Sequence, residues 1–592
     1  MSKSALDTNA DAKAVNADRS LLPVKTIAWV LFLALAILVI RLLTSLLDDQ
    51  FGIGLDVINV ICYLLTVVIW VSLLVHFLFF NKFPMVARVA CLLVLIGLPF
   101  FFKFVLRPVL NGNIGIARFE PIWQTTKGQV ATPTNEEVDL KVESEFDFPR
   151  FLGTSQNAWV ENPMPLNLSD FSKAETVWRQ PIGKGWSGFA ARNGFAVTME
   201  QRGELECVTC YDILQGELRW IHEHKARHLD RRNAGGVGPR ATPTIDAGRV
   251  YSMGAVGHFV CLDGANGEVI WSKNMNELLG IELCENKKDR DGFEILYETN
   301  TTLEWGRSGS PLIVGDKVIV AGGGPASEAD STDDPKKAVA TLIAFDKLTG
   351  EEVWRSGTEP IAYGSPTLVN VSTVSQVLIV AESLAMGFDP QNGELLWEYP
   401  RPGSSNSEAN CSQVTLVSDN FVLTSKGYSD GGGELLVLEV NEGKLEPKSV
   451  WSSPIVLKTK FNNPIIIDGH SYAISNGYLE CVDLRDGKRI WKHRRAMMGN
   501  GQILKSGNHL LVHSEKGVIH LVDPTPDGYR ELGSFPTIDG VCWNTFCLYG
   551  PYLLVRSELE AACFELPLSS DFKGNQPVLS FDEEKKETAA VE

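Results

Sequence analysis

One motif recurs along most of this chain and restricts the folds that the chain can adopt. In each copy a short apolar strand ends in Asp or Glu, a turn containing Gly follows, and the next strand often ends in Trp. The copies run from Cys210 to Trp220, Cys261 to Trp271, Ala344 to Trp354, Gly387 to Trp397, Val437 to Trp451, Cys481 to Trp491, Leu521 to Leu532 and Cys563 to Glu565. One such unit cannot bury both of its faces, so neighbouring copies must stack. The repeat therefore predicts an all-β protein built from stacked hairpins.

The residue types of the motif indicate how each copy folds. An Asp side chain at the end of a strand accepts hydrogen bonds from the backbone N–H groups of the turn that follows. Gly supplies the positive φ that such a turn needs. The Trp at the end of the outer strand can pack between neighbouring sheets and donate its indole N–H. Each copy thus predicts a hairpin that is anchored to the next sheet.

Further strands complete the copies to four-stranded units. An additional strand precedes each hairpin and opens with small or polar residues, often before Pro. These openings are residues 187–189, 241–243, 309–311, 364–366, 412–414, 462–464, 501–503 and 544–546. The last copy lacks a Trp strand, whereas an unpaired strand at 175–178 precedes the first copy, and pairing the two would leave no open edge. We therefore predict an eight-bladed β-propeller of four-stranded blades over residues 146–571.

The first part of the chain has a different composition, and we assign residues 23–110 to a transmembrane region. Three apolar stretches occupy residues 26–47, 57–80 and 85–106. A spanning helix needs roughly 20 apolar residues, and the second stretch meets this need without any charge. The other two carry Arg or Lys side chains that would have to reach the headgroups. The sequence thus predicts about three transmembrane helices before the propeller.

The basic residues near these stretches predict the orientation of the chain in a membrane. The N-terminal segment and the second short loop carry Lys and Arg, whereas all charged residues of the first loop are acidic. This predicts a multi-pass protein of the inner (cytoplasmic) membrane with its propeller on the periplasmic, or extracytoplasmic, side. If the third stretch does not span, the propeller lies in the cytoplasm instead. We expect residues 1–22 to be a disordered cytoplasmic tail, 111–145 a linker, and 572–592 a disordered acidic tail.

The motif from Asp through Gly to Trp, best seen at Ala344 to Trp354, resembles the tryptophan-docking repeat of the pyrroloquinoline-quinone-like propeller family. The resemblance covers about residues 150–570. That family includes quinoprotein alcohol and glucose dehydrogenases, some of them with several N-terminal spans, and also a non-catalytic lipoprotein that assembles outer-membrane proteins. The soluble dehydrogenases carry two adjacent cysteines over the cofactor, a calcium ion held by carboxylates and an Asn, and a catalytic Asp. This sequence has no adjacent cysteine pair, and none of the other groups can be assigned to its residues.

We expect any ligand of this fold to bind at the axial mouth, near the starts of the innermost strands. The residues at these starts are Trp186, Arg240, Arg307, Tyr363, Asn410, Asn463, Asn500 and Asn544. Such groups could bind a small acidic or polar molecule, and Arg240 and Arg307 could hold a carboxylate. The alternative, which we favour, is that they satisfy backbone groups and ordered water in the channel.

Other clusters give weaker signals. Cys207 and Cys210 form a Cys-x-x-Cys pair, but residues three apart on a strand point to opposite faces, so we expect two buried thiols. Cys542 and Cys547 are better candidates for a disulfide. His222, His224 and His228 lie among Lys and Arg, which favours an anion-binding or solvated loop over a metal site, and we predict no metal. The net charge of −18 argues against nucleic acid as a partner.

Three functions fit these observations. The first is a membrane-anchored scaffold that binds an envelope protein or another ligand, with the lipid bilayer as its second partner. The second is a membrane dehydrogenase of sugars or alcohols that uses pyrroloquinoline quinone with Ca²⁺, although no mapped residue supports that cofactor. The third is a sensor subunit. We favour the scaffold, because no catalytic constellation is recognisable.

Overall fold

The structure is a computed structural model of the whole chain. It describes residues 24–76, 84–121, 131–230, 235–289, 291–325, 339–371, 373–403, 409–441, 444–573 and 577. The chain divides into two compact units, residues 1–125 and 126–592. The tail expected at residues 1–22 and most of the tail expected at 572–592 lie outside the described residues.

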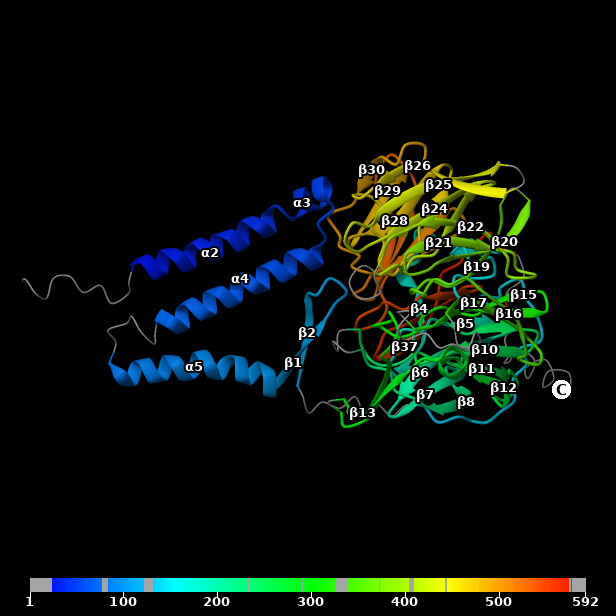
Figure 1. The fold of residues 1–592 in the computed structure, drawn as a ribbon, viewed down its shortest axis with the longest axis horizontal. Coiled ribbons are helices and arrows are strands. Elements are labelled where there is room, and N and C mark those ends of the chain that lie inside the picture. Colours follow the sequence, from blue (N-terminus) through cyan, green and yellow to red (C-terminus); the bar gives the residue numbers. More distant parts are fainter. Residues whose placement is uncertain are drawn as a thin grey trace, which may run out of the picture. The chain divides into compact units, whose positions relative to one another are not determined.

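The first unit is mainly helical (Figure 1). Its elements are α2 (Val24–Leu42), α3 (Thr44–Phe51), α4 (Leu55–Val75), α5 (Met85–Phe104), β1 (Leu106–Leu110) and β2 (Ile116–Pro121). Among the described residues α2 and α4 are long and apolar enough to cross a membrane, whereas the apolar part of α5 covers only residues 88–102. Two of the predicted spans therefore have a matching helix, and the third stays a prediction.

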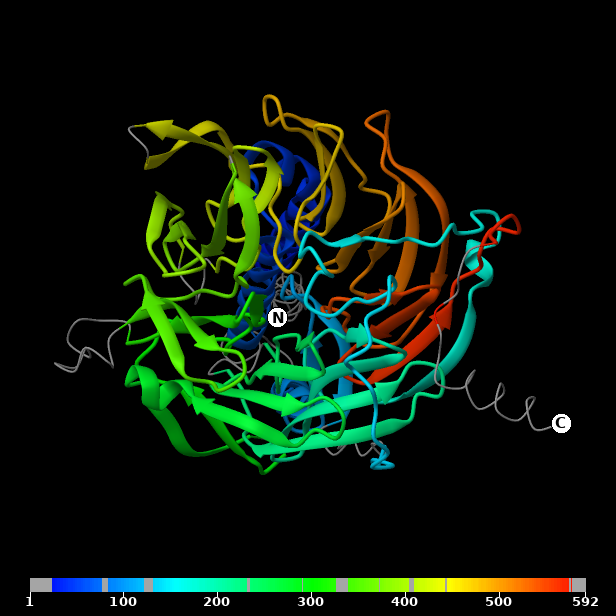
Figure 2. The same ribbon diagram turned by 90° about the vertical axis from the view of Figure 1, so that its right-hand side faces the viewer.

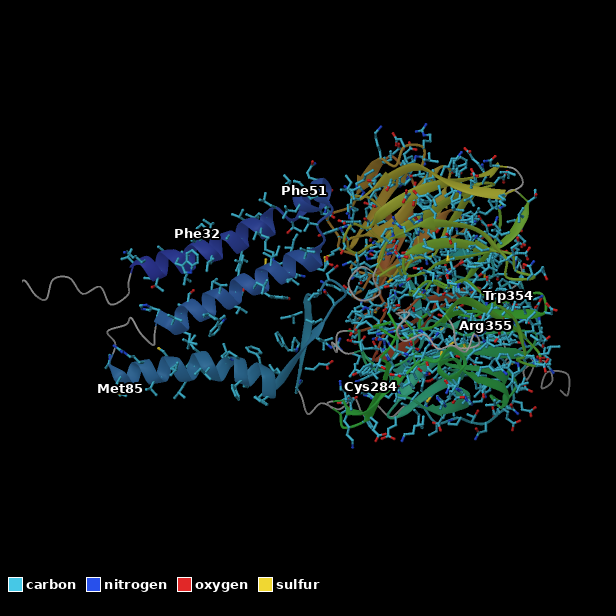
Figure 3. All side chains as sticks on the ribbon, viewed as in Figure 1. Phe32, Phe51, Met85, Cys284, Trp354 and Arg355 are labelled. Atoms are coloured by element: carbon cyan, nitrogen blue, oxygen red, sulfur yellow. The ribbon has the colours of Figure 1, made fainter. Side chains whose placement is uncertain are left out.

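The surface of these helices is apolar. Phe32 on α2, Phe51 on α3 and Met85 on α5 project away from the helices, and they are 59%, 65% and 80% exposed (Figure 3). The unit also has internal polar contacts, since Asn59 Nδ2 on α4 donates a 2.8 Å hydrogen bond to the carbonyl of Asn113. Exposed apolar side chains on helices of this length are what a lipid environment requires.

The second unit consists mainly of antiparallel four-stranded sheets. In chain order of their inner strands the sheets are β5 (Ala190–Arg192), β6 (Phe195–Arg202), β7 (Leu205–Asp212) and β8 (Leu218–Lys225); β9 (Thr244–Asp246), β10 (Arg249–Met253), β11 (His258–Asp263) and β12 (Val269–Asn274); β15 (Leu312–Val314), β16 (Lys317–Gly323), β17 (Ala340–Asp346) and β18 (Glu352–Ser356); and β19 (Thr367–Val371), β20 (Val374–Val380), β21 (Leu384–Phe388) and β22 (Leu395–Pro400). The sheets that follow are β23 (Thr415–Ser418), β24 (Phe421–Lys426), β25 (Gly432–Asn441) and β26 (Lys444–Ser453); β27 (Ile465–Ile467), β28 (His470–Ser475), β29 (Tyr478–Asp483) and β30 (Arg489–Lys492); β31 (Gln502–Ser506), β32 (His509–His513), β33 (Val518–Asp523) and β34 (Arg530–Pro536); and β35 (Cys547–Tyr549), β36 (Tyr552–Arg556), β37 (Glu560–Glu565) and β4 (Glu175–Pro181).

Smaller elements complete the unit. The two-residue strand β3 (Trp159–Val160) adds to β31 in parallel, and β13 (Leu283–Lys288) pairs with β14 (Glu294–Glu298). Two short helical segments are η2 (Phe171–Lys173) and α6 (Met275–Leu279).

The sheets surround a common centre, as Figure 2 shows. Their innermost strands contact one another, since β5 contacts both β9 and β35, and β15 contacts both β9 and β19. A mostly-β chain of four-stranded sheets arranged in this way confirms the predicted β-propeller fold.

The tryptophans dock as the repeat predicts. The indole N–H of Trp220 donates a 2.9 Å hydrogen bond to the carbonyl of Gly264 in the turn of the next sheet. Gly267 of the same turn has a φ of +77°, and a Cβ there would lie 2.6 Å from the Trp220 ring. The Trp rings on β4, β12, β18, β26 and β30 donate to turn carbonyls in the same way. Trp397 differs, because its indole N–H binds the side chain of Gln376.

Strand β4, which precedes the first sheet in the sequence, closes the last sheet. Strand β4 pairs antiparallel with β37, with Trp178 opposite Cys563. This confirms the predicted pairing of the unpaired segment at 175–178 with the last copy of the repeat. The sheet edge that the last copy would otherwise expose is therefore covered.

A segment before this strand crosses the unit. Phe148 forms a β-bridge with Ala191 in β5, whereas Gln156 bonds the backbone of Pro366 and Leu368 beside and in β19. The predicted linker is also partly packed on the sheets, because the Val138 N–H binds the carbonyl of Ala265. The domain boundaries themselves stay a prediction.

All eleven cysteines are free thiols. Cys207 and Cys210 are fully buried on β7, as expected. The disulfide considered between Cys542 and Cys547 is wrong, since both are buried and unpaired. Their separate positions, before β35 and at its start, pack each thiol into the core.

Candidate axial binding site

Hydrogen bonds link the openings of the inner strands into a closed circuit, which we call the axial collar. Going around the sheets, the bonds are Gly188 N to Thr242 Oγ1 (3.1 Å), Thr242 N to Ser310 Oγ (2.9 Å), Ser310 N to Ser365 Oγ (2.9 Å), Gln413 Nε2 to the Ser365 carbonyl (3.2 Å), Gln413 N to Asn463 Oδ1 (2.7 Å), Gln502 Nε2 to the carbonyls of Phe461 and Trp543 (2.7 Å each) and Asn544 Nδ2 to the Ser187 carbonyl (2.8 Å). Small hydroxyl and amide side chains are needed here because they can reach the neighbouring backbone. The residues of the predicted mouth therefore lie at or beside one continuous polar ring.

The two arginines of the predicted site are held by the protein itself. Arg240 donates to the carbonyls of Gly235 and Gly236, each at 3.1 Å, and burial lowers the pKa of its guanidinium to about 10. Arg307 is 2% exposed and pairs with the equally buried Glu298 at 2.8 Å. Several donor groups of both arginines are thus bound by the protein itself, and a joint hold of Arg240 and Arg307 on one carboxylate stays a prediction.

Tyr363 and Asn410 also bind backbone groups. The Tyr363 hydroxyl accepts hydrogen bonds from the N–H groups of Glu304 and Trp305, both at 3.1 Å. Asn410 Nδ2 donates to the carbonyls of Ala381, Glu382 and Arg401. Tyr363 and Asn410 thus hold backbone groups of the loops around them.

Four of the predicted residues nevertheless retain a buried polar atom without a partner in the described part of the chain. These atoms are Arg307 Nη2, Asn410 Oδ1, Asn500 Nδ2 and Asn544 Oδ1. All four residues are at most 2% exposed. Because an unpaired buried polar atom costs roughly 1–3 kcal/mol, such atoms point to ordered water or a ligand.

Sequence reasoning missed an aromatic cluster beside this ring. Trp543 lies 4.4 Å from the ring centre of Trp186 and 5.1 Å from that of Phe461. Its indole N–H donates a 2.6 Å hydrogen bond to Glu515 Oε1. The available signal was that an aromatic residue directly precedes the strand opening in four sheets, as Trp186, Tyr363, Phe461 and Trp543 do; only Trp186 and Tyr363 were chosen.

One buried carboxyl near the site has an unusual acidity. Glu206, at 4% exposure, accepts a 3.0 Å hydrogen bond from the N–H of Ala255. Burial raises the pKa of Glu206 to about 7, against the lowering effects of that hydrogen bond and of the Arg240 charge. This carboxyl is therefore partly protonated near neutral pH.

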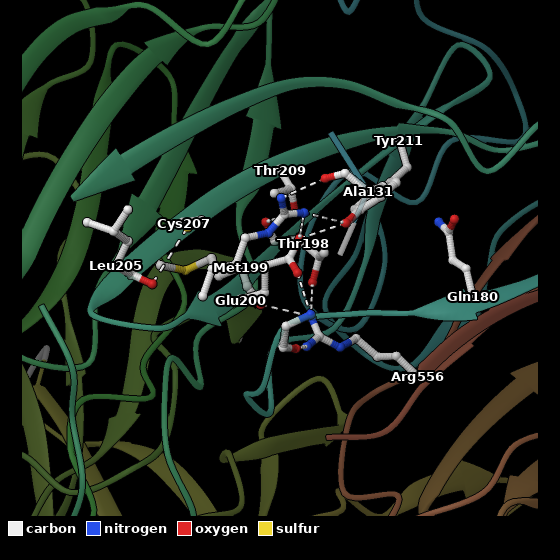
Figure 4. Close-up of polar contacts among 12 residues, drawn as sticks. Ala131, Gln180, Thr198, Met199, Glu200, Leu205, Cys207, Thr209, Tyr211 and Arg556 are labelled. Atoms are coloured by element: carbon white, nitrogen blue, oxygen red, sulfur yellow. Dashed lines mark hydrogen bonds and ion pairs between the residues drawn. The ribbon is translucent and has the colours of Figure 1, made fainter. Parts of the chain in front are cut away.

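A second buried network joins the first and last sheets close to the collar (Figure 4). Glu200 Oε1 accepts hydrogen bonds from the Tyr211 hydroxyl at 2.7 Å and from Arg202 at 3.0 Å. Arg556, which is 1% exposed, donates to Thr198 Oγ1 and to the carbonyls of Met199 and Gly183. Most polar groups of this network bind one another or the backbone, although Arg202 Nε and Arg556 Nε have no partner in the described part of the chain; this pattern favours a structural role.

The histidines do not form the considered cluster. His224 stacks on His258 of the next sheet with 3.8 Å between ring centres, while His228 is buried elsewhere with Nδ1 near the Leu296 carbonyl. Burial lowers the pKa of His222, His224 and His258, the last to about 4. The described residues contain no group of three or more His, Cys, Asp or Glu that could hold a metal.

These residues do not fit a calcium-bound quinone. Calcium takes six to eight oxygen ligands, largely carboxylates, whereas the predicted mouth offers indole, guanidinium, phenol and neutral amide groups. The carboxylate of Glu298 beside it is paired with Arg307. The described donor set is thus unsuited to that cofactor.

Comparisons with known proteins agree with the repeat. The family described as outer membrane protein assembly factor BamB matches residues 171–493, which is more than half of the chain. The outer membrane protein assembly factor BamB of Shewanella oneidensis is 24% identical over 313 residues, covering 48% of this chain and 74% of that protein. The protein of the same name from Moranella endobia is 21% identical over 295 residues, covering 48% of this chain and 61% of that protein.

Solved structures with similar folds include two kinds of protein. BamB from Moraxella catarrhalis has 13% identity and a TM-score of 0.42, covering 68% of this chain and 99% of its own. The quinohemoprotein alcohol dehydrogenase from Comamonas testosteroni also has 13% identity, with a TM-score of 0.48, covering 74% of this chain and 85% of its own.

Proposed function

Because this chain belongs to the protein family described as outer membrane protein assembly factor BamB, we propose that it is a membrane-anchored, eight-bladed propeller that binds other proteins of the cell envelope. The propeller lies on the extracytoplasmic side of an inner membrane that the N-terminal helices cross more than once. The chain acts as a scaffold and carries out no reaction of its own.

One observation carries this proposal. The match to the family covers residues 171–493. The two relatives from Shewanella oneidensis and Moranella endobia are both named as outer membrane protein assembly factors. Most polar groups at the axial mouth bind the propeller itself. This favours a role in binding partner proteins over a role in catalysis. The eight sheets linked by the axial collar are the proposed blades.

The anchor is supported by composition. Helices α2 and α4 have mean hydropathies of 2.2 and 2.5 over a membrane-length window. Lys and Arg before α2 and acidic residues after it favour an N-terminus in the cytoplasm. The apolar stretch in α5 then has to return the chain to the outer side.

Cross-linking in native membranes tests the scaffold. The full chain with a C-terminal tag is cross-linked in intact cells, purified under denaturing conditions, and its adducts identified by mass spectrometry. We expect envelope proteins to be enriched over those captured by an unrelated multi-pass membrane protein with the same tag. No enrichment would contradict the scaffold.

Topology and cofactor use are tested separately. Added protease should remove the C-terminal tag from spheroplasts, whereas a protected tag would place the propeller in the cytoplasm. Titration of the purified full chain with pyrroloquinoline quinone and Ca²⁺ should leave its melting temperature unchanged. A saturable rise, followed by dye reduction with a sugar or alcohol, would instead establish a dehydrogenase.

A further inference from the structure

The aromatic cluster at the axial mouth is preorganised. Trp543 lies between Trp186 and Phe461, with ring centres 4.4 and 5.1 Å away, and Glu515 fixes its indole N–H. All three rings are only partly buried. They come from the openings of three different sheets, so the ring packing depends on closure of the propeller.

Asn500 directly precedes the strand opening 501–503, in the sheet between those of Phe461 and Trp543, and it lies between Gly499 and Gly501. Gly499 has a φ of +62°, and a Cβ there would lie 2.5 Å from that of Glu515. A Cβ at Gly501 would lie 2.0 Å from the carbonyl oxygen of His513. Only Gly therefore fits on either side of Asn500. The Glu515 side chain that packs against Gly499 also accepts the indole hydrogen bond of Trp543.

Two unpartnered polar atoms belong to this region. Asn500 is 2% exposed and its Nδ2 has no partner in the described part of the chain. Asn544, next to Trp543, is 1% exposed; its Nδ2 donates to the carbonyls of Gly185 and Ser187 on either side of Trp186, while its Oδ1 has no partner among the described residues. One donor and one acceptor are thus left over, one just before the strand opening 501–503 and one in the residue that follows Trp543.

We propose that this part of the axial mouth binds an extended segment of a partner polypeptide, with a peptide group on Asn500 and Asn544 and an apolar side chain against Trp543. A peptide unit offers one C=O and one N–H, which complements one amide donor and one amide acceptor. Aromatic rings add apolar contact area and stacking. Neither Asn brings charge, so a neutral backbone fits better than an ionised small molecule. The inference rests on the proposed scaffold function and adds the site that contacts the partner.

A photoreactive peptide tests this site. The probe is acetyl-glycyl-(benzoylphenylalanyl)-glycine amide, cross-linked to the full chain in detergent and mapped by mass spectrometry. We expect adducts in the segments around Trp186, Phe461 and Trp543, with competition by acetyl-glycyl-phenylalanyl-glycine amide. Methyl glucoside should not compete. Adducts confined to other segments, or competition by the glucoside alone, would overturn the proposal.

Variants separate binding from folding. Asn500→Ala should weaken peptide binding about fivefold to tenfold, the effect of one lost hydrogen bond, and should not lower the melting temperature, because the lost amide N–H had no protein partner. Trp543→Ala should weaken binding further, and the exposed Trp159→Ala serves as the matched control with unchanged binding. If Asn500→Ala lowers the melting temperature and leaves binding unchanged, Asn500 only holds ordered water and the proposal is wrong.

This result is independent of the partner search in membranes. Envelope partners captured through other segments, without peptide adducts at Trp543, would leave the scaffold in place and refute this site. Peptide binding at Trp543 without any envelope partner would refute the scaffold as proposed and retain a peptide-binding site.

Discussion

The guanidinium of Arg556 donates a 2.7 Å hydrogen bond to Oγ1 of Thr198, across the junction between the last sheet and the first. The same Nη1 binds the carbonyl of Met199 at 2.8 Å, and Glu200 follows directly on β6. Burial lowers the pKa of Arg556 to about 10, although the Glu200 charge opposes this shift. Closure of the ring thus involves a charged group that has been removed from water.

We expect Arg556→Leu to reduce the free energy of unfolding by roughly 3–5 kcal/mol, because it removes three buried hydrogen bonds and a buried positive charge that favours ionised Glu200. Arg355→Leu is the matched control. Arg355 lies at the surface of β18 and pairs with Glu352 (Figure 3), so its loss should cost less than about 1 kcal/mol. Urea unfolding of the full chain followed by circular dichroism measures both, and equal losses would contradict a special role of the junction.

The docking of Trp220 on Gly267 predicts a steric requirement for glycine. Gly267→Ala adds a Cβ 2.6 Å from the buried ring, at a φ of +77°. Gly469→Ala has nearly the same φ, +75°, but nothing within 4 Å of its Cβ. Both variants incur the cost of positive φ, roughly 1–2 kcal/mol, so the melting temperature should fall clearly further for Gly267→Ala. Equal decreases would show that the ring does not constrain this turn.

Stability should fall in acid through His513. Its imidazole is fully buried, with Nε2 2.9 Å from Thr537 Oγ1, and burial lowers its pKa to about 3, aided by the charge of His520. In the unfolded chain the His513 imidazole takes up a proton near pH 6.5, whereas in the folded chain it stays neutral down to about pH 3. The contribution of His513 is therefore lost as the pH falls from about 6.5 to about 3, by up to about 1.4 kcal/mol per pH unit.

Urea unfolding between pH 4 and 7 measures this effect. The pH dependence should be shallower for His513→Gln than for the unchanged chain. His470→Gln, at the start of β28, should keep the original slope. An unchanged slope in His513→Gln would contradict the assignment.

The buried thiols of Cys207 and Cys210 should be inert. Burial raises the pKa of both, so little thiolate forms at neutral pH. We expect alkylation of the folded chain to spare both residues, and both to react after unfolding in urea. Peptide mapping without reductant measures this, and a disulfide joining Cys207 to Cys210 would contradict the prediction.

Part of the candidate site could be found from the strand openings alone. Most openings supply a hydroxyl or amide side chain that reaches its neighbour, and Asn463 and Asn544, chosen from these openings, take part in the axial collar. Trp543 and Glu515 were not identified, because they belong to different sheets and their 2.6 Å contact exists only when those sheets are adjacent. Arg240 and Arg307 were placed at the strand openings, but their carbonyl and Glu298 partners follow from loop conformations that have no repeating pattern.

The sequence by itself determined the repeat: Asp, Gly and Trp at recurring intervals specify a hairpin whose turn bonds need only nearby residues, and an indole that docks on the turn of the next copy. It also determined that β4 had to complete the last sheet, since one strand was missing there and one was left over. Only the tertiary structure decided which polar groups remain unpaired at the axis. Whether Asn500 and Asn544 find partners depends on the distances between neighbouring sheets, and these distances are set by the packing of the whole ring.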